Sequence, residues 1–347
     1  MRLVAKLARR FPDIPIAQLD EQGLERRDAA LAHRLVETTI KRWLTLAWLL
    51  EGAAKRPLAS LEPRVQAALL VGAAQLCFFD RVPARAAVDE SVRWISHAGR
   101  SRAAGLVNAA LRRVAEAMGQ ERREQATLAR DELPLAQGGA RTLAPSALLP
   151  RDPLDRLSVA TGTPRPLLRR WVKQWSLAEA QRIALHSLRD PPTIVHTAYA
   201  RHPLPGADLL TPHESPGFHL WKGSRQALAE LLGQRHDVWA QDPAAAAALD
   251  LATELSPRLV ADLCAGRGTK TKQLLAMFPD ATVLAYDDNP KRRRELAQVF
   301  QGHSRVVLVE DRQRLLDWAG KVELVVVDAP CSNTAVLARR PEARHRA

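Results

Sequence analysis

The chain has 347 residues, of which 46% are hydrophobic, and it carries a formal net charge of +13. The hydrophobic fraction is ordinary for globular proteins and excludes wholesale disorder, while the length predicts two or three domains. The positive charge favours a polyanion or an anionic membrane surface as partner, although a solvated basic face explains it equally well.

No segment is typical of a membrane protein. The longest apolar stretch, residues 65–79, is shorter than the roughly 20 residues of a spanning helix, and the N-terminus lacks the apolar region of a signal peptide. We therefore expect a cytoplasmic protein without a membrane partner. Cys77, Cys264 and Cys331 show no CxxC spacing, so neither a disulfide framework nor a metal site is predicted.

Residues 1–130 are predicted to form an all-α domain. Their apolar residues recur every three or four positions, and prolines 57, 63 and 83 fall between the periodic segments. Residues 131–153, rich in Pro and Gly, are predicted to be a linker. Residues 154–240 mix helical periodicity with a strand near PPTIVHTAY, which predicts a small mixed α/β middle domain.

Residues 241–347 alternate short apolar strands with helices of about ten residues, the pattern of right-handed βαβ units and a parallel sheet. Four strands can be counted, whereas such sheets usually contain more. The fold class is therefore multidomain, α plus α/β, with a C-terminal Rossmann-like domain that we expect to be cut short.

The first turn of this domain contains Gly266 and Gly268, which allow the backbone to approach an anionic ligand at a helix N-terminus. The turn is not a phosphate-binding Walker loop, because Thr269 precedes Lys270. A structural tight turn is an equally good interpretation of these glycines alone. The acids that end the next two strands, Asp287 and Asp311, favour a nucleoside ligand, although either one alone could be an exposed helix cap.

The fourth strand leads into Asp328 and Cys331 at the carboxyl edge of the sheet. A thiol here, near arginines, is suited to pyrimidine C5 methylation, because C5 becomes nucleophilic only after sulfur adds to C6. A lone cysteine is more often a buried packing residue, but its place between a strand end and a basic loop favours a functional role.

These motifs together resemble the RsmB (Sun/Fmu) family of cytosine-5 methyltransferases of 16S ribosomal RNA. The resemblance rests on DLCAGRGTKT, the Asp287 strand and VVVDAPCSNTAVLARRPEARHR, and on VPARAAVDE and VNAALRR upstream. It covers nearly the whole chain and implies an N-terminal NusB-like RNA-binding domain, a C-terminal domain that binds S-adenosylmethionine, and 16S ribosomal RNA as partner. We expect a monomer.

The resemblance also implies roles for individual residues. Asp287 would hold the ribose, Asp311 would lie at the adenine, and Asp328 would lie near the reacting centre. Cys331 would assist release of the product, while a second cysteine, after the next strand, would attack the base. The sequence ends at Ala347, before that cysteine, so we expect a truncated gene or a frameshift. The residues implied to wrap the methionine end of the cofactor are Cys264, Ala265, Gly266, Arg267, Gly268, Thr269 and Lys270.

The turn departs from the family's Cys-Ala-Ala-Pro-Gly-Gly-Lys pattern. Arg267 replaces the rigid proline, and it is a candidate partner for the cofactor carboxylate. In the helical domain, residues 81–113 include seven arginines against Asp89 and Glu90, which suits phosphate contacts. The candidate RNA contacts among them are Arg81, Arg85, Arg112 and Arg113. The KRRR segment at 291–294 is interpreted as a solvated helix face.

Three functions compete on this evidence. The leading hypothesis is a methyltransferase that acts through a cysteine–C6 adduct. The second is a non-catalytic RNA-binding homologue that keeps the NusB-like domain and a defective methyltransferase fold. The third, in which Cys331 itself attacks the base, requires an incomplete sheet to be stable.

Overall fold

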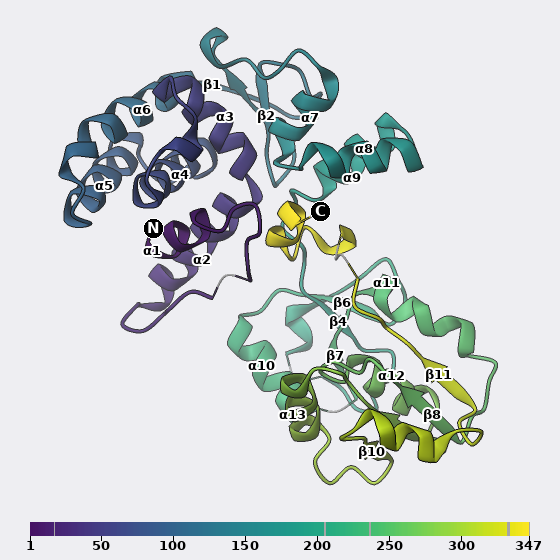
Figure 1. The fold of residues 1–347 in the computed structure, drawn as a ribbon. Coiled ribbons are helices and arrows are strands. Elements are labelled where there is room, and N and C mark those ends of the chain that lie inside the picture. The colour runs from purple at the N-terminus through teal and green to yellow at the C-terminus, as the bar shows by residue number, and fades with distance from the viewer. Residues whose placement is uncertain (17, 205, 236, 332–333, 347) are drawn as a thin grey trace. The chain divides into compact units, whose positions relative to one another are not determined.

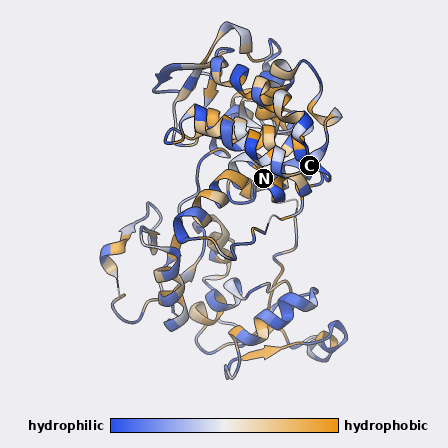
Figure 2. Cartoon of the chain, turned by 90° about the vertical axis from the view of Figure 1, so that its left-hand side faces the viewer, coloured by the Kyte–Doolittle hydropathy of each residue, from blue (hydrophilic) through white to orange (hydrophobic). Residues whose placement is uncertain are grey.

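The computed structural model describes residues 1–16, 18–204, 206–235, 237–331 and 334–346, and the chain divides into two compact units (Figure 1). The helical unit comprises Met1–Pro191 and Ser332–Ala347, and the sheet unit comprises Pro192–Cys331. Among the described residues, no helix is both long and apolar enough to span a bilayer. Figure 2 shows that hydrophilic and hydrophobic residues are interspersed along most of the helices.

The helical unit begins with a bundle that is built around one buried helix, α4 (Pro63–Phe78), which contacts the other five. The apolar stretch 65–79 is therefore a core helix. At Gly72, a Cβ atom would lie 2.6 Å from Leu111 and 2.7 Å from Ser91, so the absence of a side chain lets the neighbouring helices approach closely. The other five helices are α1 (Arg2–Ala8), α2 (Arg26–Lys41), α3 (Trp43–Ala54), α5 (Ala84–His97) and α6 (Ala104–Ala117).

A small antiparallel sheet follows the bundle, with the strand order β1 (Met118–Arg123), β3 (Ala140–Leu143), β2 (Glu132–Pro134). This differs from the prediction of helices up to residue 130 and a linker at 131–153. The glycines that indicated a linker, Gly138 and Gly139, have positive φ and turn the chain between β2 and β3. Glu132 also breaks the apolar pattern that predicts a buried strand, since it is a fully buried acid that pairs with Arg123.

Three further helices belong to the helical unit, although the sequence placed them in a middle domain at 154–240. They are α7 (Pro153–Thr161), α8 (Arg165–Gln174) and α9 (Leu177–His186). Their apolar side chains, including Leu157, Leu168 and Ala184, belong to the same hydrophobic core as the bundle. The structure thus divides the predicted middle domain near residue 191.

The last described segment, η8 (Pro341–Arg346), packs into the helical unit, where Figure 1 draws it in yellow. Arg344 is fully buried and donates hydrogen bonds to the backbone carbonyls of Lys41, Thr161 and Ser187. His345, also buried, contacts the carbonyl of Ile40 through Nε2 at 2.8 Å.

The sheet unit contains two sheets. The first is antiparallel, with the order β5 (Leu210–Pro212), β6 (Phe218–Trp221), β4 (Ile194–His196), β7 (Trp239–Ala240), and it includes the strand predicted at PPTIVHTAY. Helix α10 (Arg225–Gln234) lies between β6 and β7 in the chain. The chain then forms α11 (Pro243–Ala246) and the 3₁₀ helix η5 (Ala247–Ala252) before the second sheet.

The second sheet is parallel and has the four strands that the sequence predicted. In chain order its elements are β8 (Leu259–Asp262), α12 (Thr269–Met277), β9 (Thr282–Ala285), α13 (Pro290–Val299), β10 (Val306–Leu308), the 3₁₀ helix η6 (Arg312–Trp318) and β11 (Leu324–Val326). Alternate strand residues pack on its two faces, as the two-residue period of a strand requires.

The strand order of this sheet is β10-β9-β8-β11. The chain therefore moves outward from β8 to β10 and then returns to the other side of β8. In parallel α/β sheets, ligands bind outside the carboxyl ends of the strands at this kind of switch point. The fold thus directs attention to the residues that follow β8 and β11.

Candidate functional site

Two backbone hydrogen bonds hold the turn after β8, one to the segment after β9 and one within the turn. Ala265 N donates to Tyr286 O at 2.9 Å, and Gly268 N donates to Ala265 O at 2.7 Å. Both glycines of the turn have positive φ, +59° at Gly266 and +83° at Gly268. The chain can make this turn because glycine adopts positive φ without steric cost.

The two glycines serve different purposes. At Gly268, a Cβ atom would lie 2.3 Å from the ring of Phe300, so this glycine permits close packing against the residue that follows α13. At Gly266, the nearest atom to an added Cβ is 4.0 Å away. The open space therefore lies at Gly266, where a ligand could approach the backbone.

Asp287, directly after β9, fixes the turn through its carboxylate. Oδ2 accepts a hydrogen bond from Gly266 N at 3.0 Å, and Oδ1 accepts one from Asn289 N at 2.9 Å. Asp287 is only 4% exposed, and Arg292 lies 3.7 Å from Oδ2. The acid that was predicted to hold a ribose therefore aligns the glycine turn.

Arg293 supports this arrangement, although the whole KRRR segment was predicted to be a solvated helix face. Its guanidinium donates to Asp287 O at 2.8 Å and to Asp288 O at 3.0 Å, and it lies 5.6 Å from the ring centre of Tyr286. The other members of KRRR are exposed, as predicted, while Arg293 is half-buried. No local periodicity could have identified it, because its contacts run from α13 back to the residues before the helix start.

Asp262, at the carboxyl end of β8, is fully buried. Its Oδ2 accepts a hydrogen bond from Thr271 at 2.8 Å, while Oδ1 has no partner among the described residues. Burial raises the pKa of Asp262 to about 6, against the opposing effects of Thr271 and of the Cys264 backbone N–H. A buried oxygen without a donor beside an open turn fits a ligand that carries a donor or a positive charge.

Lys270 and Asp328 form an ion pair at 2.8 Å between the first turn of α12 and the segment after β11. The Lys270 side chain is 13% exposed and that of Asp328 58% exposed. Two of the predicted site residues are thus brought together across the switch point, with the acid facing solvent.

The three cysteines have different environments. Cys331 is exposed and follows β11, Cys264 is half-buried in the turn, and Cys77 is buried in the helical unit. Burial, together with the charges of Asp287 and Asp262, raises the pKa of the Cys264 thiol, and burial raises the pKa of Cys77 to about 12. Both thiols are therefore kept protonated at neutral pH, and by burial alone Cys331 is the exposed sulfur of the three.

Two other predicted residues have protein partners. Arg267 lies 2.8 Å from Glu295 and is largely exposed, so its interpretation as a partner of the cofactor carboxylate has no support from its contacts. Asp311 is exposed and caps η6 by accepting a hydrogen bond from Gln313 N at 3.0 Å. The helix-cap interpretation left open for Asp311 is confirmed, and a ligand role would have to use its remaining lone pairs.

The candidate RNA contacts all lie on the surface of the helical unit. Arg81 lies in the turn before α5, and Arg85, in the first turn of α5, is 3.5 Å from Asp89. Arg112 and Arg113 lie on α6, where Arg113 donates to Ala53 O at 2.7 Å. All four side chains are exposed and can reach a phosphate.

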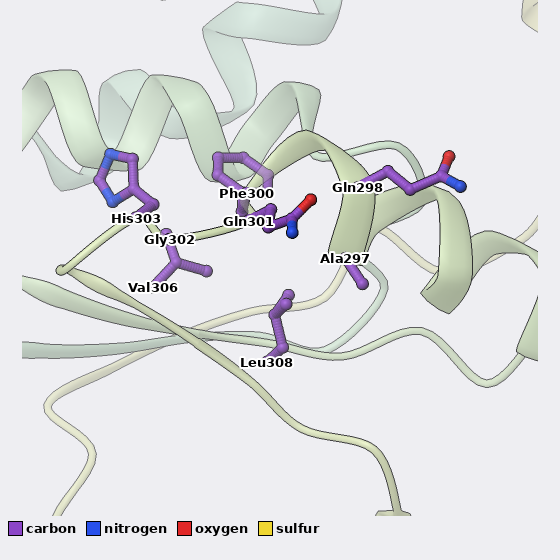
Figure 3. Close-up of a pocket in the computed structure, with 8 residues that line it drawn as sticks. All are labelled: Ala297, Gln298, Phe300, Gln301, Gly302, His303, Val306 and Leu308. Carbon is purple, nitrogen blue, oxygen red and sulfur yellow. The ribbon is translucent and has the colours of Figure 1, made fainter.

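A cavity of about 530 Å³ lies elsewhere in the sheet unit, between the end of α13 and β10. Figure 3 shows Val306 and Leu308 on its strand side, with Phe300 and His303 on the segment that follows the helix. None of the residues predicted to bind a cofactor lines it. The cavity is therefore distinct from the cluster at the carboxyl ends of β8 and β9.

The residues around the Gly266 turn fit a nucleoside that carries a cationic amino-acid tail. The turn offers open space and a helix N-terminus, Asp287 offers carboxylate oxygens beside it, and Asp262 offers a buried acceptor without a donor. Lys270 and Asp328 provide one charge of each sign nearby.

Comparison with known proteins matches both units. Residues 5–116 match the model of the NusB family, and residues 247–347 match that of the 16S rRNA methyltransferases RsmB/F. The chain is 30% identical over 343 residues to the ribosomal RNA small subunit methyltransferase B of Pseudomonas putida, covering 94% of the chain and 71% of that relative. The Escherichia coli protein of that name is 29% identical over 356 residues, covering 93% of the chain and 71% of the relative.

A solved structure titled "Crystal Structure of PH0851" is similar to this one at a TM-score of 0.67 and 15% sequence identity. The similarity covers the whole chain and 77% of the solved chain. At this level of identity it supports the fold: helical first, then mixed, then a parallel sheet.

Proposed function

Because the chain belongs to the RsmB family of 16S rRNA methyltransferases with an N-terminal NusB domain, we propose that it methylates C5 of a cytosine in 16S rRNA with S-adenosylmethionine as methyl donor. The observation that carries the proposal is the cluster at the carboxyl ends of the parallel strands. There Asp287 accepts a hydrogen bond from the open Gly266 turn, and the buried Asp262 at the end of β8 has an oxygen without a partner among the described residues.

Each part of the cofactor has a proposed partner. The turn 264–270 would hold the methionine end, Asp287 the ribose and Asp311 the adenine. Asp262 Oδ1 would face the positive charge, because it is the buried acceptor in the turn that still lacks a donor. When bound, the cofactor supplies an electrophilic methyl group.

The remaining chemistry belongs to the protein and the base. C5 of cytosine becomes nucleophilic when a thiolate adds to C6, and the family resemblance assigns this attack to a cysteine after the next strand. C5 would then take the methyl group, and the product would be released when a base removes the C5 proton and the electrons expel the sulfur. We assign Cys331 to the release step and Asp328 to the reacting centre, following the family pattern. Their position after β11 supports this, since Cys331 is exposed and Lys270 fixes Asp328.

The helical unit would bind the RNA. Arg81 lies just before α5, Arg85 lies on α5, and Arg112 and Arg113 lie on α6. All four are exposed and would contact phosphates, which position the RNA without reading its bases. We propose that the protein acts as a monomer on ribosomal RNA in the cytoplasm.

Methyl transfer to 16S rRNA tests the proposal. The protein would be incubated with unmodified 16S rRNA and radiolabelled S-adenosylmethionine, followed by nucleoside analysis. We expect label in 5-methylcytosine, and 16S rRNA substituted with 5-fluorocytosine should trap a covalent adduct, because the C5 fluorine cannot leave as a proton does. RNA binding without label or adduct would overturn the proposal in favour of the binding-only homologue.

A further inference from the structure

A chain of buried hydrogen bonds connects the antiparallel sheet to the helix that follows the Gly266 turn. Gln241, just after β7, is 6% exposed, and its Oε1 lies 2.5 Å from Trp239 Nε1 and 2.9 Å from His196 Nδ1. Its Nε2 lies 2.7 Å from Oε1 of Gln273 on α12. Gln273 is 2% exposed, and its Nε2 donates to Ala246 O at 3.1 Å.

The direction of every bond in this chain follows from one donor. The indole N–H of Trp239 can only donate, so the atom of Gln241 that it meets must be the amide oxygen. The amide nitrogen then donates to Gln273, and Gln273 donates to Ala246. His196 must carry its hydrogen on Nδ1, because it meets the same oxygen.

An aromatic cluster holds His196 and Trp239, the groups that donate to Gln241, in place. The His196 ring stacks on Phe218 with ring centres 4.2 Å apart, and it meets Trp239 edge-on at 5.0 Å. Burial lowers the pKa of His196, which keeps the ring neutral at neutral pH. The acceptor end of Gln241 is therefore fixed by rigid groups.

The donor end of Gln241, its amide nitrogen, contacts α12 through Gln273. Gln273 lies three residues after Lys270, so both side chains project from neighbouring positions on one side of the helix. In the same helix, Lys270 pairs with Asp328 and Thr271 donates to Asp262. A rotation of α12 would disturb all three contacts together.

We propose that Gln241 is a positioning residue for the cofactor turn. It sets the rotation of α12 through Gln273, and thereby places Lys270 and Thr271 against Asp328 and Asp262. This rests on the proposed function for the identity of the ligand, and it adds a residue outside the parallel sheet to the residues that determine cofactor affinity.

Substitutions at position 241 can remove the hydrogen bond from Gln241 to Gln273 alone, or remove all the hydrogen bonds of this side chain. In Gln241→Glu, the carboxylate still accepts from Trp239 and His196, but it cannot donate to Gln273, so only the link to α12 is lost. Gln241→Leu loses both ends. A matched control is Gln66→Leu in the helical unit, which removes a side-chain amide that is 8% exposed and donates to Leu61 O at 2.7 Å.

Calorimetric titration with S-adenosylmethionine, together with RNA filter binding, distinguishes a positioning role from a general loss of stability. We expect roughly a tenfold higher cofactor Kd for both variants at position 241, because a buried partner is left unsatisfied, with RNA affinity unchanged. Gln66→Leu should lower the unfolding temperature and leave the cofactor Kd unchanged.

A wild-type Kd in Gln241→Glu, or an equal rise in Gln66→Leu, would overturn the inference while the proposed function stands. A wild-type protein that binds no S-adenosylmethionine would instead overturn the proposed function.

Discussion

Asp287 Oδ2 accepts a hydrogen bond from the backbone N–H of Gly266 at 3.0 Å, which joins the end of β9 to the turn after β8. Through this bond the Asp287 carboxylate has two roles. It holds the turn open at Gly266, where an added Cβ would meet nothing closer than 4.0 Å, and it keeps carboxylate oxygens beside that opening. The shape of the site and its charge therefore depend on the same side chain.

Gly268→Ala should destabilise the sheet unit more than its backbone conformation alone explains. The new methyl would lie 2.3 Å from the Phe300 ring, so overpacking of about 1–3 kcal/mol adds to the strain of positive φ. Gly302→Ala isolates the strain, because its φ is +74° and its Cβ would have no neighbour within 4 Å. Urea unfolding of both variants tests this, and equal destabilisation would contradict the role given to Phe300.

Asp262 should make the free energy of unfolding depend on pH between about 4 and 6. Its pKa in the folded chain is about 6, above the ordinary value of 3.8, so the native state binds this proton more tightly than the unfolded state does. The contribution to stability is therefore present below pH 4 and is lost as the pH rises through 6, by up to about 3 kcal/mol. Asp262→Asn should flatten this part of the curve in urea unfolding at pH 4.5 and 7. An unchanged slope in that variant would show that other groups titrate.

His345 should make the free energy of unfolding fall at low pH, which is the opposite pH dependence to that of Asp262. Burial lowers its pKa from 6.5 to about 4, so its contribution to stability is full above pH 6.5 and is lost as the pH falls toward 4. The loss should reach about 3 kcal/mol. His345→Gln does not titrate and can still donate to Ile40 O, so it should remain stable at pH 4.5. The exposed His186→Gln is the control, and the same benefit in that variant would refute the assignment.

Replacement of Arg81, Arg85, Arg112 and Arg113 by alanine should weaken RNA binding and its dependence on salt. With about 0.7–0.9 in the slope of log K against log salt for each phosphate contact, loss of four contacts lowers the slope by about 3. Filter binding at several salt concentrations measures this. Alanine at four other exposed arginines, Arg26, Arg27, Arg169 and Arg170, should leave the slope nearly unchanged. Equal losses would mean that net charge alone binds the RNA.

The parallel sheet and its acidic strand ends were predictable from the sequence, because buried strands and ten-residue helices produce distinct periodicities. The sheet at 118–143 was not, since the buried Glu132 and the turn glycines imitate a polar linker. Arg293 and Gln241 were also missed. Each acts through a polar contact with a residue that is distant in the chain or across a helix start, and no local period reports such contacts.

The most direct test of the account is calorimetric titration of S-adenosylmethionine into the wild-type protein and into Asp287→Ala. We expect saturable heat at one site for the wild type, and a loss of at least tenfold in affinity for the variant. That variant removes both the acceptor of Gly266 N and the proposed ribose partner. The absence of heat and of a thermal shift in a folded wild-type protein would contradict the account, as would equal affinity in the variant.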